Sequence, residues 1–442
     1  MISTGTATEA VTGGRGFPPA WRSWLAWAIP ATFYLAAFYL RSAPAVMTTE
    51  LMRDFHIGAK SLGNLSACYF YAYVLMQIPT GILVDSWGAK RLLVSGSLLG
   101  AVGTVVFAST DNFVAACVSR ALVGGATAVG WVITLKLATH WFPSKSFAML
   151  SGLGLLVGNI GALFAQVPLR LLVESMGWRA VGLASAVVLL IIGAVAWISV
   201  RDDPSDIGFR SYAPAGLSAL RNRSVRHLLN GFGNIFKYSN TWLIIFSQGG
   251  FVGSMLSFTG LWGPPYLRTR FELKPTAAAA VCSVMIICWA VASPIAGRLS
   301  DAIGRRKPIY LGGAVAAAAG WAILFYLPGL SLPGFLVIAA LTSFSCGAVI
   351  LGFAYAKESV PVKFLGTITG SINMGNMVGP MLLQPGIGWM LDRHWSGTLA
   401  NGARAYSAQE YQWGFALIIA WMTLSCLLIS ITRETNCKPT AG

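Results

Sequence analysis

The sequence predicts an all-α membrane protein with twelve transmembrane helices in two pseudo-symmetric six-helix bundles. Apolar residues make up 55% of its 442 residues and charged residues only 10%, against about 25% charged residues in soluble proteins. A chain of this length divides into about twelve apolar spans of roughly 20 residues or more, joined by short connections. A turn motif that occurs once in each half of the chain indicates that the halves arose by duplication.

The turn motif reads Gly, three residues, Asp, two residues, Gly and then a basic cluster, and its copies start 297 − 81 = 216 positions apart. Its glycines allow backbone conformations that other residues resist. Its aspartate can cap the next helix or pair with a cation on a neighbouring helix, and its basic cluster favours the cytoplasmic side. We therefore expect a tight cytoplasmic turn at each copy. The motif residues are Gly81, Asp85, Gly88 and Arg91, and then Gly297, Asp301, Gly304 and Arg305.

This pair of turns resembles the loop signature of the major facilitator superfamily, which lies between the second and third helices and again between the eighth and ninth. The resemblance covers roughly residues 21–433. It implies the major facilitator fold, a central solute site and alternating access by rocking of the two halves. It also implies that the motif residues form the cytoplasmic gate.

The apolar stretches and the polar residues that end them set the expected spans. The first half, 21–200, should hold helices at 21–51, 58–84, 91–110, 113–139, 147–172 and 178–200. The second half, 240–432, should hold helices at 240–268, 276–299, 307–328, 332–359, 365–392 and 411–432. Between them, 201–239 forms a cytoplasmic linker, with an amphipathic helix around 215–236 lying on anionic lipid. We expect residues 1–20 to be a disordered cytoplasmic tail and 433–442 a short one.

The net charge of +16 is typical of loops that obey the positive-inside rule and does not indicate a nucleic-acid partner. With the N-terminus inside, about 18 Lys and Arg fall in cytoplasmic segments and about 9 in the opposite loops. This predicts an integral membrane protein, a monomer in the plasma membrane of a bacterium, with both termini cytoplasmic. The seven cysteines lie mostly in apolar runs, where we expect packing residues and no disulfides or metal ligands.

The duplication extends into the fifth and eleventh spans. Gln166 and Gln384 are 384 − 166 = 218 positions apart, and Gly161 matches Gly379 at the same offset. Small residues let helices approach closely. Ordinary packing is sufficient to explain the glycines of these two spans, which include Gly388. Close approach between helices of opposite halves, as halves that rock require, would explain them as well.

Four basic residues fall within the expected spans, namely Arg41, Arg120, Lys136 and Lys357. Each would cost about 2.5–3.5 kcal/mol at the bilayer centre, so we expect them to face protein or water. Arg41 resembles the helix-1 arginine that binds substrate anions in the organophosphate/phosphate antiporters and the anion/cation symporters. A guanidinium suits this role because its fork matches a carboxylate or phosphate bidentately. The alternative is a structural arginine paired with backbone carbonyls or a loop acid.

The sequence departs from the organophosphate group at two positions. That group has a second arginine in helix 7, six residues before a tryptophan that resembles Trp262, and Leu256 stands there in this chain. The helix-2 lysine of the group corresponds to Gln77. These departures favour a singly anionic or zwitterionic solute, such as a monocarboxylate or an amino acid, over a phosphate ester.

The other three cations leave alternatives open. Arg120 resembles the helix-4 arginine of proton-coupled members, but Val123 replaces a glutamine of that motif. Lys136 either extends to the cytoplasmic interface or enters the cavity. Lys357 and Glu358 end the tenth span, where we expect the inner gate. The partners expected for these two are Asp301, Arg298 and Arg305.

Neutral polar side chains complete the expected solute site. The sequence from Trp262 to Tyr266, which contains two prolines, is expected to break the seventh span near its outer end. No Asp or Glu stands near the middle of an expected span, which leaves uniport, exchange, or symport with the ion carried otherwise. The neutral candidates are Tyr34, Tyr71, Gln77, Asn159, Gln166, Gln248, Asn373, Asn376 and Gln384.

These observations predict a secondary or facilitative transporter of a small anionic or zwitterionic solute. Its partners would be that solute, a co-transported ion in the case of symport, and the lipid bilayer. One alternative is a proton-coupled efflux pump for amphiphilic compounds, suggested by 23 Phe and 16 Trp, and another is a non-transporting sensor with a transporter fold. The sequence lacks His-Glu-x-x-His and Gly-x-x-x-x-Gly-Lys motifs and has four scattered histidines, so we expect no enzyme, no metal and no cofactor.

Overall fold

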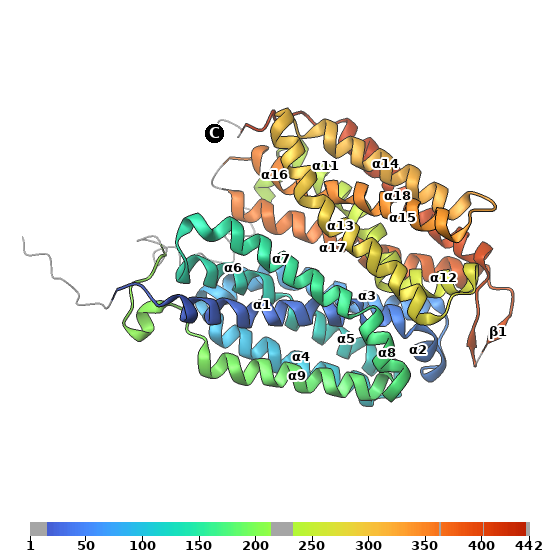
Figure 1. The fold of residues 1–442 in the computed structure, drawn as a ribbon, viewed down its shortest axis with the longest axis horizontal. Helices are drawn as coiled ribbons and strands as arrows, with labels where there is room; N and C mark the ends of the chain where they lie inside the picture. The colour runs from blue at the N-terminus through green and yellow to red at the C-terminus, as the bar shows by residue number, and fades with distance from the viewer. Residues whose placement is uncertain (1–15, 214–232, 362–363, 401, 439–442) are drawn as a thin grey trace, which may run out of the picture.

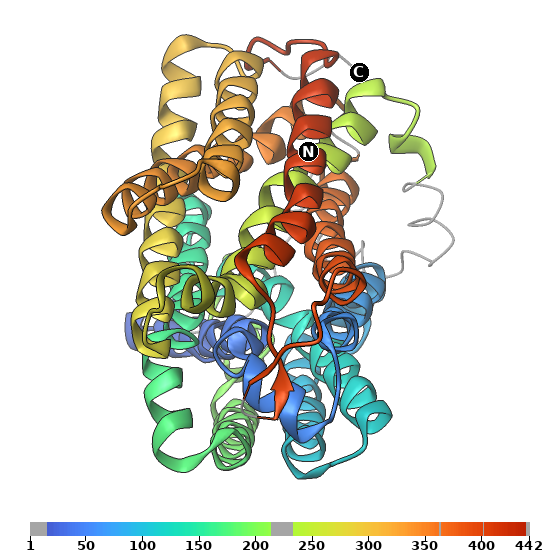
Figure 2. The ribbon, with the colours of Figure 1, turned by 90° about the vertical axis from the view of Figure 1, so that its right-hand side faces the viewer.

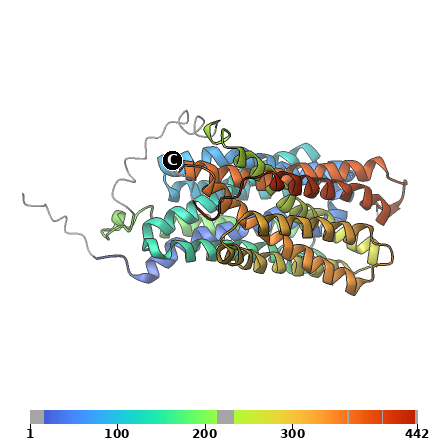
Figure 3. The same cartoon turned by 90° about the horizontal axis from the view of Figure 1, so that it is seen from above.

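The protein consists of two helical halves that lie side by side, as seen in a computed structural model (Figure 1). The structure describes residues 16–213, 233–361, 364–400 and 402–438. In Figure 1 the N-terminal half (blue to green) lies below the C-terminal half (yellow to red). Seen from above, the helices of both halves run along the long axis of the molecule (Figure 3).

The N-terminal half contains the elements up to α9. They are α1 (Ala20–Ser42), η1 (Ala43–Val46), α2 (Thr48–Asp54), α3 (Ala59–Ser86), α4 (Ala89–Ser109), α5 (Phe113–Thr127), α6 (Val129–Trp141), η2 (Ser144–Ser146), α7 (Phe147–Phe164), α8 (Val167–Met176) and α9 (Trp178–Ser199). The short η3 (Pro204–Ile207) follows in the linker.

The C-terminal half begins at α11. Its elements are α11 (Ser239–Ser257), η5 (Phe258–Trp262), α12 (Gly263–Phe271), α13 (Pro275–Ile303), α14 (Lys307–Tyr326), α15 (Leu332–Cys346), η6 (Gly347–Ile350), α16 (Leu351–Glu358), α17 (Leu365–Arg393), β1 (Leu399–Ala400), β2 (Ala403–Arg404) and α18 (Ala408–Ser430). The two short strands pair antiparallel.

The arrangement fits the predicted six helices in each half. In the described part of the chain, ten helical stretches are long and apolar enough to cross a membrane, and the bent α3 makes an eleventh. The 29-residue α17 packs against both α3 and α11 and is consistent with a twelfth. The amphipathic helix expected around 215–236 and most of the expected N-terminal tail lie outside the described residues.

Breaks occur in the first, fourth, fifth, seventh and tenth spans. The first helix, expected at 21–51, ends at Ser42 and turns through η1 before α2. Pro44 explains this difference, because a proline has no N–H to donate and its ring collides with the carbonyl four residues earlier. The seventh span breaks as predicted, through the π turn η5 and then α12, which has prolines at its start.

The two motif turns lie at the same end of the molecule, which we call the signature end, and the other is the opposite end. Gly88 and Gly304 have φ angles of 92° and 71°, which confirms the glycine-dependent turns. At each turn a carboxylate just after the sixth helix of that half caps the third helix. Asp202 accepts the N–H of Lys90 at 2.6 Å, and Glu434 accepts the N–H groups of Arg306 and Lys307 at 3.0 Å. Asp202 and Glu434 therefore take the capping role that was one alternative for the motif aspartates.

The two halves are in tight contact at the opposite end. The carbonyl oxygen of Ala59 touches Gly388, and a Cβ at Gly63 would lie 2.5 Å from the carbonyl oxygen of Gln384. Figure 2, which faces this end, shows the orange β1–β2 hairpin over the blue segment that contains α2. The opposite end therefore closes the boundary between the halves.

Towards the signature end the same helix pair parts. α3 bends by 56° between its segments Ala59–Gln77 and Pro79–Ser86. Beyond the bend, Gly81 on α3 and Gly366 and Gly370 on α17 have no neighbouring atom where a Cβ would point. The halves are thus in close contact at the opposite end, whereas these three glycines towards the signature end face open space.

The glycine-rich helices pack both within and between the halves. Gly161 meets the backbone of Leu35 and Gly379 meets that of Gly249, so these two glycines bring together helices of the same half, as ordinary packing would. Gly388 lies nine residues further along α17, about two and a half turns, and meets the backbone of Ala59 in the other half.

Candidate solute site

Arg41 lies near the end of α1, at the boundary between the two halves. Its side chain is only 5% exposed. The guanidinium stacks over Phe38 at 3.9 Å, and Nη1 lies 3.8 Å from the sulfur of Met377 on α17. Its Nε has no hydrogen-bond partner, and no carboxylate of the described residues pairs with it. A buried cation with so few partners is unusual, because its desolvation is left largely uncompensated.

Two buried tyrosines, Tyr34 and Tyr69, interact electrostatically with this guanidinium, and a third, Tyr73, packs against Tyr69. The rings of Tyr69 and Tyr73 stack with centroids 6.0 Å apart. Tyr34 also packs against Phe38 at 4.7 Å. Arg41, Phe38, Tyr34, Tyr69, Tyr73 and Met377 are called the Arg41 cluster below.

The sequence pointed to Tyr71, but the structure places that side chain elsewhere. Tyr71 is 40% exposed on another face of α3, in electrostatic range of Cys68 and Cys117. Tyr69, Tyr73 and Gln77 follow one another at four-residue spacing and so share a helix face. That spacing places Tyr69 and Tyr73 on the face of α3 that carries Gln77.

A second polar group, also at the boundary between the halves, joins the same two helices, α3 and α17. Asn373 donates through Nδ2 to Oε1 of Gln77 at 2.8 Å. The Nε2 of Gln77 and the Oδ1 of Asn376 are buried without a partner. The structure therefore brings Arg41, Tyr34, Gln77, Asn373 and Asn376 to the boundary between the halves, and leaves donors and an acceptor unpaired there.

Three other candidates bind backbone carbonyls at helix breaks. Gln166 and Gln384 donate to the carbonyls of Thr259 and Leu256, at 3.0 and 3.1 Å, where α11 passes into η5. Gln248 donates to a carbonyl of η6 at 3.1 Å. The duplicated glutamines thus converge on one break, and the structure does not bring these three to the Arg41 cluster.

Two remaining candidates also lie apart from the cluster. Asn159 is half-buried on α7 and makes no hydrogen bond to the described residues, while Lys357 is exposed at the end of α16. Their place in a solute site remains a prediction.

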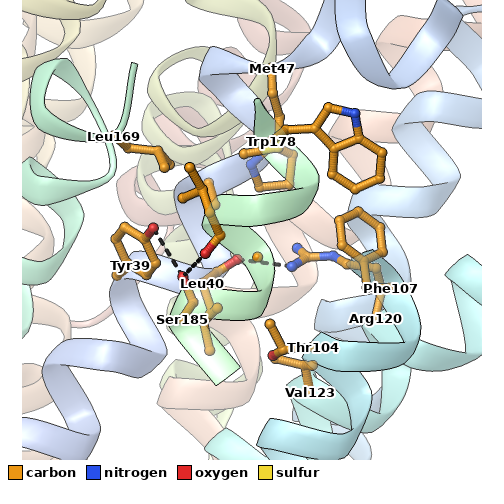
Figure 4. Close-up of a pocket in the computed structure, with 14 residues that line it drawn as sticks. Tyr39, Leu40, Met47, Thr104, Phe107, Arg120, Val123, Leu169, Trp178 and Ser185 are labelled. Carbon is orange, nitrogen blue, oxygen red and sulfur yellow. Dashed lines mark hydrogen bonds between the residues drawn. The ribbon is translucent and has the colours of Figure 1, made fainter. Parts of the chain in front are cut away.

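Arg120 serves the break in the first span. Its Nη1 donates to the carbonyl of Leu40 at 2.8 Å, the group that would accept from residue 44 if Pro44 had an N–H. Figure 4 shows Arg120 beside Phe107 and aimed at Leu40, at the edge of a cavity inside the N-terminal half. This cavity holds about 40 Å³ of free space, enough for a few water molecules, and it is separate from the Arg41 cluster.

At the signature end, ion pairs connect the helices within each half. Lys136 lies 3.1 Å from Asp85 and also donates to the carbonyl of Val84. Of its two alternatives, the structure therefore supports a place at the interface.

In the C-terminal half the central cation is Arg306. It pairs with Glu358 at 2.8 Å and with Asp301 at 2.5 Å. The expectation of Arg298 or Arg305 as partners is wrong, because only Arg306 is buried between the two acids. Burial would lower the pKa of Arg306, but its hydrogen bonds with these carboxylates outweigh that effect and raise it.

The sequence did not indicate a cluster at the opposite end, which we call the Asp392 latch. Asp392, at the end of α17, accepts the N–H groups of Ala59 at 3.1 Å and Lys60 at 2.9 Å. It also accepts from Arg404 and Tyr406. Gly58 begins α3 and has no side chain to cap it, so a carboxylate from the other half takes that role. Such a cap across the chain leaves no local motif in the sequence.

Comparisons with known proteins agree with the geometry. The sequence model of the Major Facilitator Superfamily matches residues 31–382 and 250–440. The probable galactarate/D-glucarate transporter GudP of Escherichia coli (strain K12) is 23% identical over 453 residues, covering 94% of this chain and 96% of that protein. The probable sulfoacetate transporter SauU of Cupriavidus necator is 23% identical over 388 residues, covering 81% and 85%.

Solved structures show the same fold. A bacterial homolog of the human lysosomal transporter Spinster, in an inward-facing and unoccupied conformation, matches with a TM-score of 0.76 at 16% identity, covering 93% of this chain and 97% of that one. The nucleoside transporter NupG matches with a TM-score of 0.67 at 15% identity, covering 93% and 98%.

Proposed function

Because the chain belongs to the major facilitator superfamily, we propose that it is a membrane transporter that carries a small organic anion by alternating access at Arg41. The relatives named above are described as transporters of galactarate, D-glucarate and sulfoacetate, all of which are small organic acids. We further propose that a single chain is the working unit, since it holds both halves and the whole site.

The observation that carries this proposal is the buried guanidinium of Arg41, which lacks a carboxylate partner among the described residues. A solute carboxylate would supply the missing charge and accept two parallel N–H bonds from the fork. The tyrosine rings would exclude water from this pair and strengthen it. The unpaired amides of Gln77 and Asn376 suit the hydroxyl or amino groups of the solute.

Contacts across the boundary suggest how binding couples to motion. Arg41 belongs to one half and Met377 to the other, and Gln77 bonds to Asn373 across the same boundary. A solute between α1, α3 and α17 would therefore contact both halves. Its affinity must differ between the two open states for it to shift their populations.

We propose that the signature end faces the cytoplasm, in a bacterial plasma membrane with both termini inside. The basic residues of both motif turns and Arg201, at the start of the linker, lie at this end, as the positive-inside rule requires. In that orientation, the closed Asp392 latch on the outer side would fit a state in which the site opens to the cytoplasm. The described spans carry no carboxylate at mid-depth, which favours uniport or anion exchange over coupling through a buried acid.

Uptake into proteoliposomes tests the function. Purified protein should transport at least one labelled acid among galactarate, glucarate, a hexuronate and sulfoacetate, and preloading the vesicles with the same acid should accelerate uptake if the mechanism is exchange. Specific binding with no flux of any solute would favour the sensor instead. Flux of amphiphilic cations in place of acids would favour the efflux pump.

Arg41→Gln tests the site itself. The loss of two charge-assisted hydrogen bonds, about 1.5 kcal/mol each at the low end, should raise the apparent KM for the acid roughly 100-fold. Tyr73→Phe should also impair uptake, whereas Tyr71→Phe, two residues away on another face of α3, should not. Normal uptake by a folded Arg41→Gln variant would remove Arg41 from the solute site.

A further inference from the structure

A pocket with three basic side chains lies at the signature end, on the outer flank of the N-terminal half. The turn after α3, the first turn of α4 and the chain leaving α9 form its walls, and it holds about 390 Å³ of free space. Arg41 and the boundary between the halves take no part in it. Its cations are Lys90, Arg91 and Arg201.

These cations are poorly paired within the described part of the chain. The side chains of Lys90 and Arg91 make no hydrogen bond or ion pair with those residues, and Lys90 Nζ lies 4.8 Å from the ring of Trp197. Arg201 uses Nη1 on the carbonyls of Ile198 and Val200, which leaves its Nε and Nη2 free. At least two guanidinium edges therefore remain open to a ligand.

The two carboxylates that line the pocket are already engaged by the backbone. Asp202 accepts the N–H of Lys90 at 2.6 Å and caps α4. Asp206 accepts the N–H of Asp203 at 3.2 Å and closes a capping box around η3. Both carboxylates keep their negative charge, so the three cations and two carboxylates that line the pocket give it a net charge of 3 − 2 = +1.

The position of the pocket indicates which anion it takes. Trp87 and Trp197 at its rim are 46% and 58% exposed, and exposed tryptophans mark the depth of lipid headgroups in a membrane. Directly along α4 and α9 from the rim, the exposed residues are apolar, among them Leu98, Val102 and Ile191. An anion with an apolar tail fits a basic pocket that continues into an apolar face.

We propose that this pocket binds the phosphate headgroup of an anionic phospholipid, such as phosphatidylglycerol. Arg91 and Arg201 would contact the phosphate oxygens through their planar forks, and Lys90 would add a point charge beside Trp197. The acyl chains would lie along the apolar face of α4 and α9. Basic pockets beside membrane helices recognise lipid headgroups in this way.

The test measures lipid binding to the full-length protein purified in a non-ionic detergent, by native mass spectrometry with phosphatidylglycerol and phosphatidylcholine. Wild type should retain phosphatidylglycerol in preference to phosphatidylcholine. Lys90→Gln combined with Arg91→Gln should weaken phosphatidylglycerol binding about tenfold or more at low salt, since each cation near an anionic lipid contributes about a fivefold factor. These two side chains suit the test because neither has a bond within the described residues whose loss would unfold the protein.

Arg393→Gln is the matched control. Arg393 also lies over an exposed tryptophan, Trp389, at 5.4 Å, but at the opposite end, and it does not line this pocket. It should retain full binding. If the double variant does not fold, Lys90→Gln alone should still weaken binding about fivefold.

Three results would overturn the proposal. Equal retention of the two lipids would show that the pocket does not distinguish the anionic lipid from the zwitterionic one. Unchanged phosphatidylglycerol binding by the folded variants would place the lipid elsewhere. Saturable binding of inorganic phosphate that displaces the lipid would show a site for soluble anions.

Discussion

Removal of the Asp392 carboxylate should release the opposite end and favour the state open on that side. In Asp392→Ala, Lys60 loses the acceptor of its N–H and Ala59 keeps only the hydroxyl of Tyr406. A hydrogen bond to a charged group contributes about 1.5–3 kcal/mol. Because the carboxylate is 20% exposed and water can replace part of these bonds once the halves part, we expect a net effect of about 2 kcal/mol. This shifts the ratio of the two states roughly 30-fold.

Distances between spin labels report this shift in a cysteine-free background. Labels at Met176 and Leu327, both exposed at the opposite end of different halves, should move apart in the variant. Labels at Phe147 and Ile303, exposed at the signature end, should move together. Both changes should occur in the absence of solute.

Asp111→Ala controls for the loss of any carboxylate at this end. Asp111 pairs with Arg179 at 2.6 Å, and both residues belong to the N-terminal half. Its removal should leave both distance distributions as in wild type. If Asp392→Ala also leaves them unchanged while the protein stays folded, the latch does not hold the halves and the reasoning from its hydrogen bonds fails.

Three further predictions follow from contacts inside the fold. Arg120→Gln should lower the free energy of unfolding by about 1.5–3 kcal/mol. The loss should be smaller when Pro44→Ala is also present, because residue 44 then has an N–H that can bind the freed carbonyl of Leu40. Additive losses of the two substitutions in thermal unfolding would contradict this. Gly63→Ala should prevent closure of the opposite end, because the new Cβ would lie 2.5 Å from a backbone oxygen of the other half. Gly81→Ala, the control, should permit closure. The spin-label distances at the opposite end test both predictions. Burial would raise the pKa of Glu434, but four backbone N–H groups outweigh it and lower the pKa from 4.5. Its stabilisation should be complete above pH 4.5 and lost as pH falls through the lowered value, and Glu434→Gln should flatten the fall in melting temperature.

Periodic and repeated features of the sequence predicted most of the architecture. Apolar spans and the two copies of the turn motif are local patterns, so they predicted two six-helix halves and the tight turns at Gly88 and Gly304. The break near Trp262 followed from its two prolines. Hydropathy did not reveal the break at Pro44, because the residues immediately around it, 43–47, are all apolar.

Contacts between distant segments were much less predictable. Arg298, Arg305 and Arg306 stand close together in the chain, and only packing decides which of them enters the space between Asp301 and Glu358. Likewise, the choice between Tyr71 and its neighbours Tyr69 and Tyr73 depends on how α3 is rotated towards Arg41. The amino-acid composition reveals neither which arginine is buried nor how α3 is rotated.

Several of the polar side chains discussed above donate to backbone carbonyls, whereas Arg41 donates to none in the described part of the chain. This difference supports a role for Arg41 in solute binding. Arg120 binds a backbone carbonyl at a helix break, as do Gln166, Gln248 and Gln384, and Lys136 binds one at a helix end. A membrane interior offers no water to such carbonyls, so side chains must satisfy them. Arg41 lies beside a break as well, yet its closest polar contact is the weakly accepting sulfur of Met377. Among the described residues, Arg41 caps no backbone carbonyl, although the other polar side chains named here do. Reversible binding of a negatively charged solute best explains this difference.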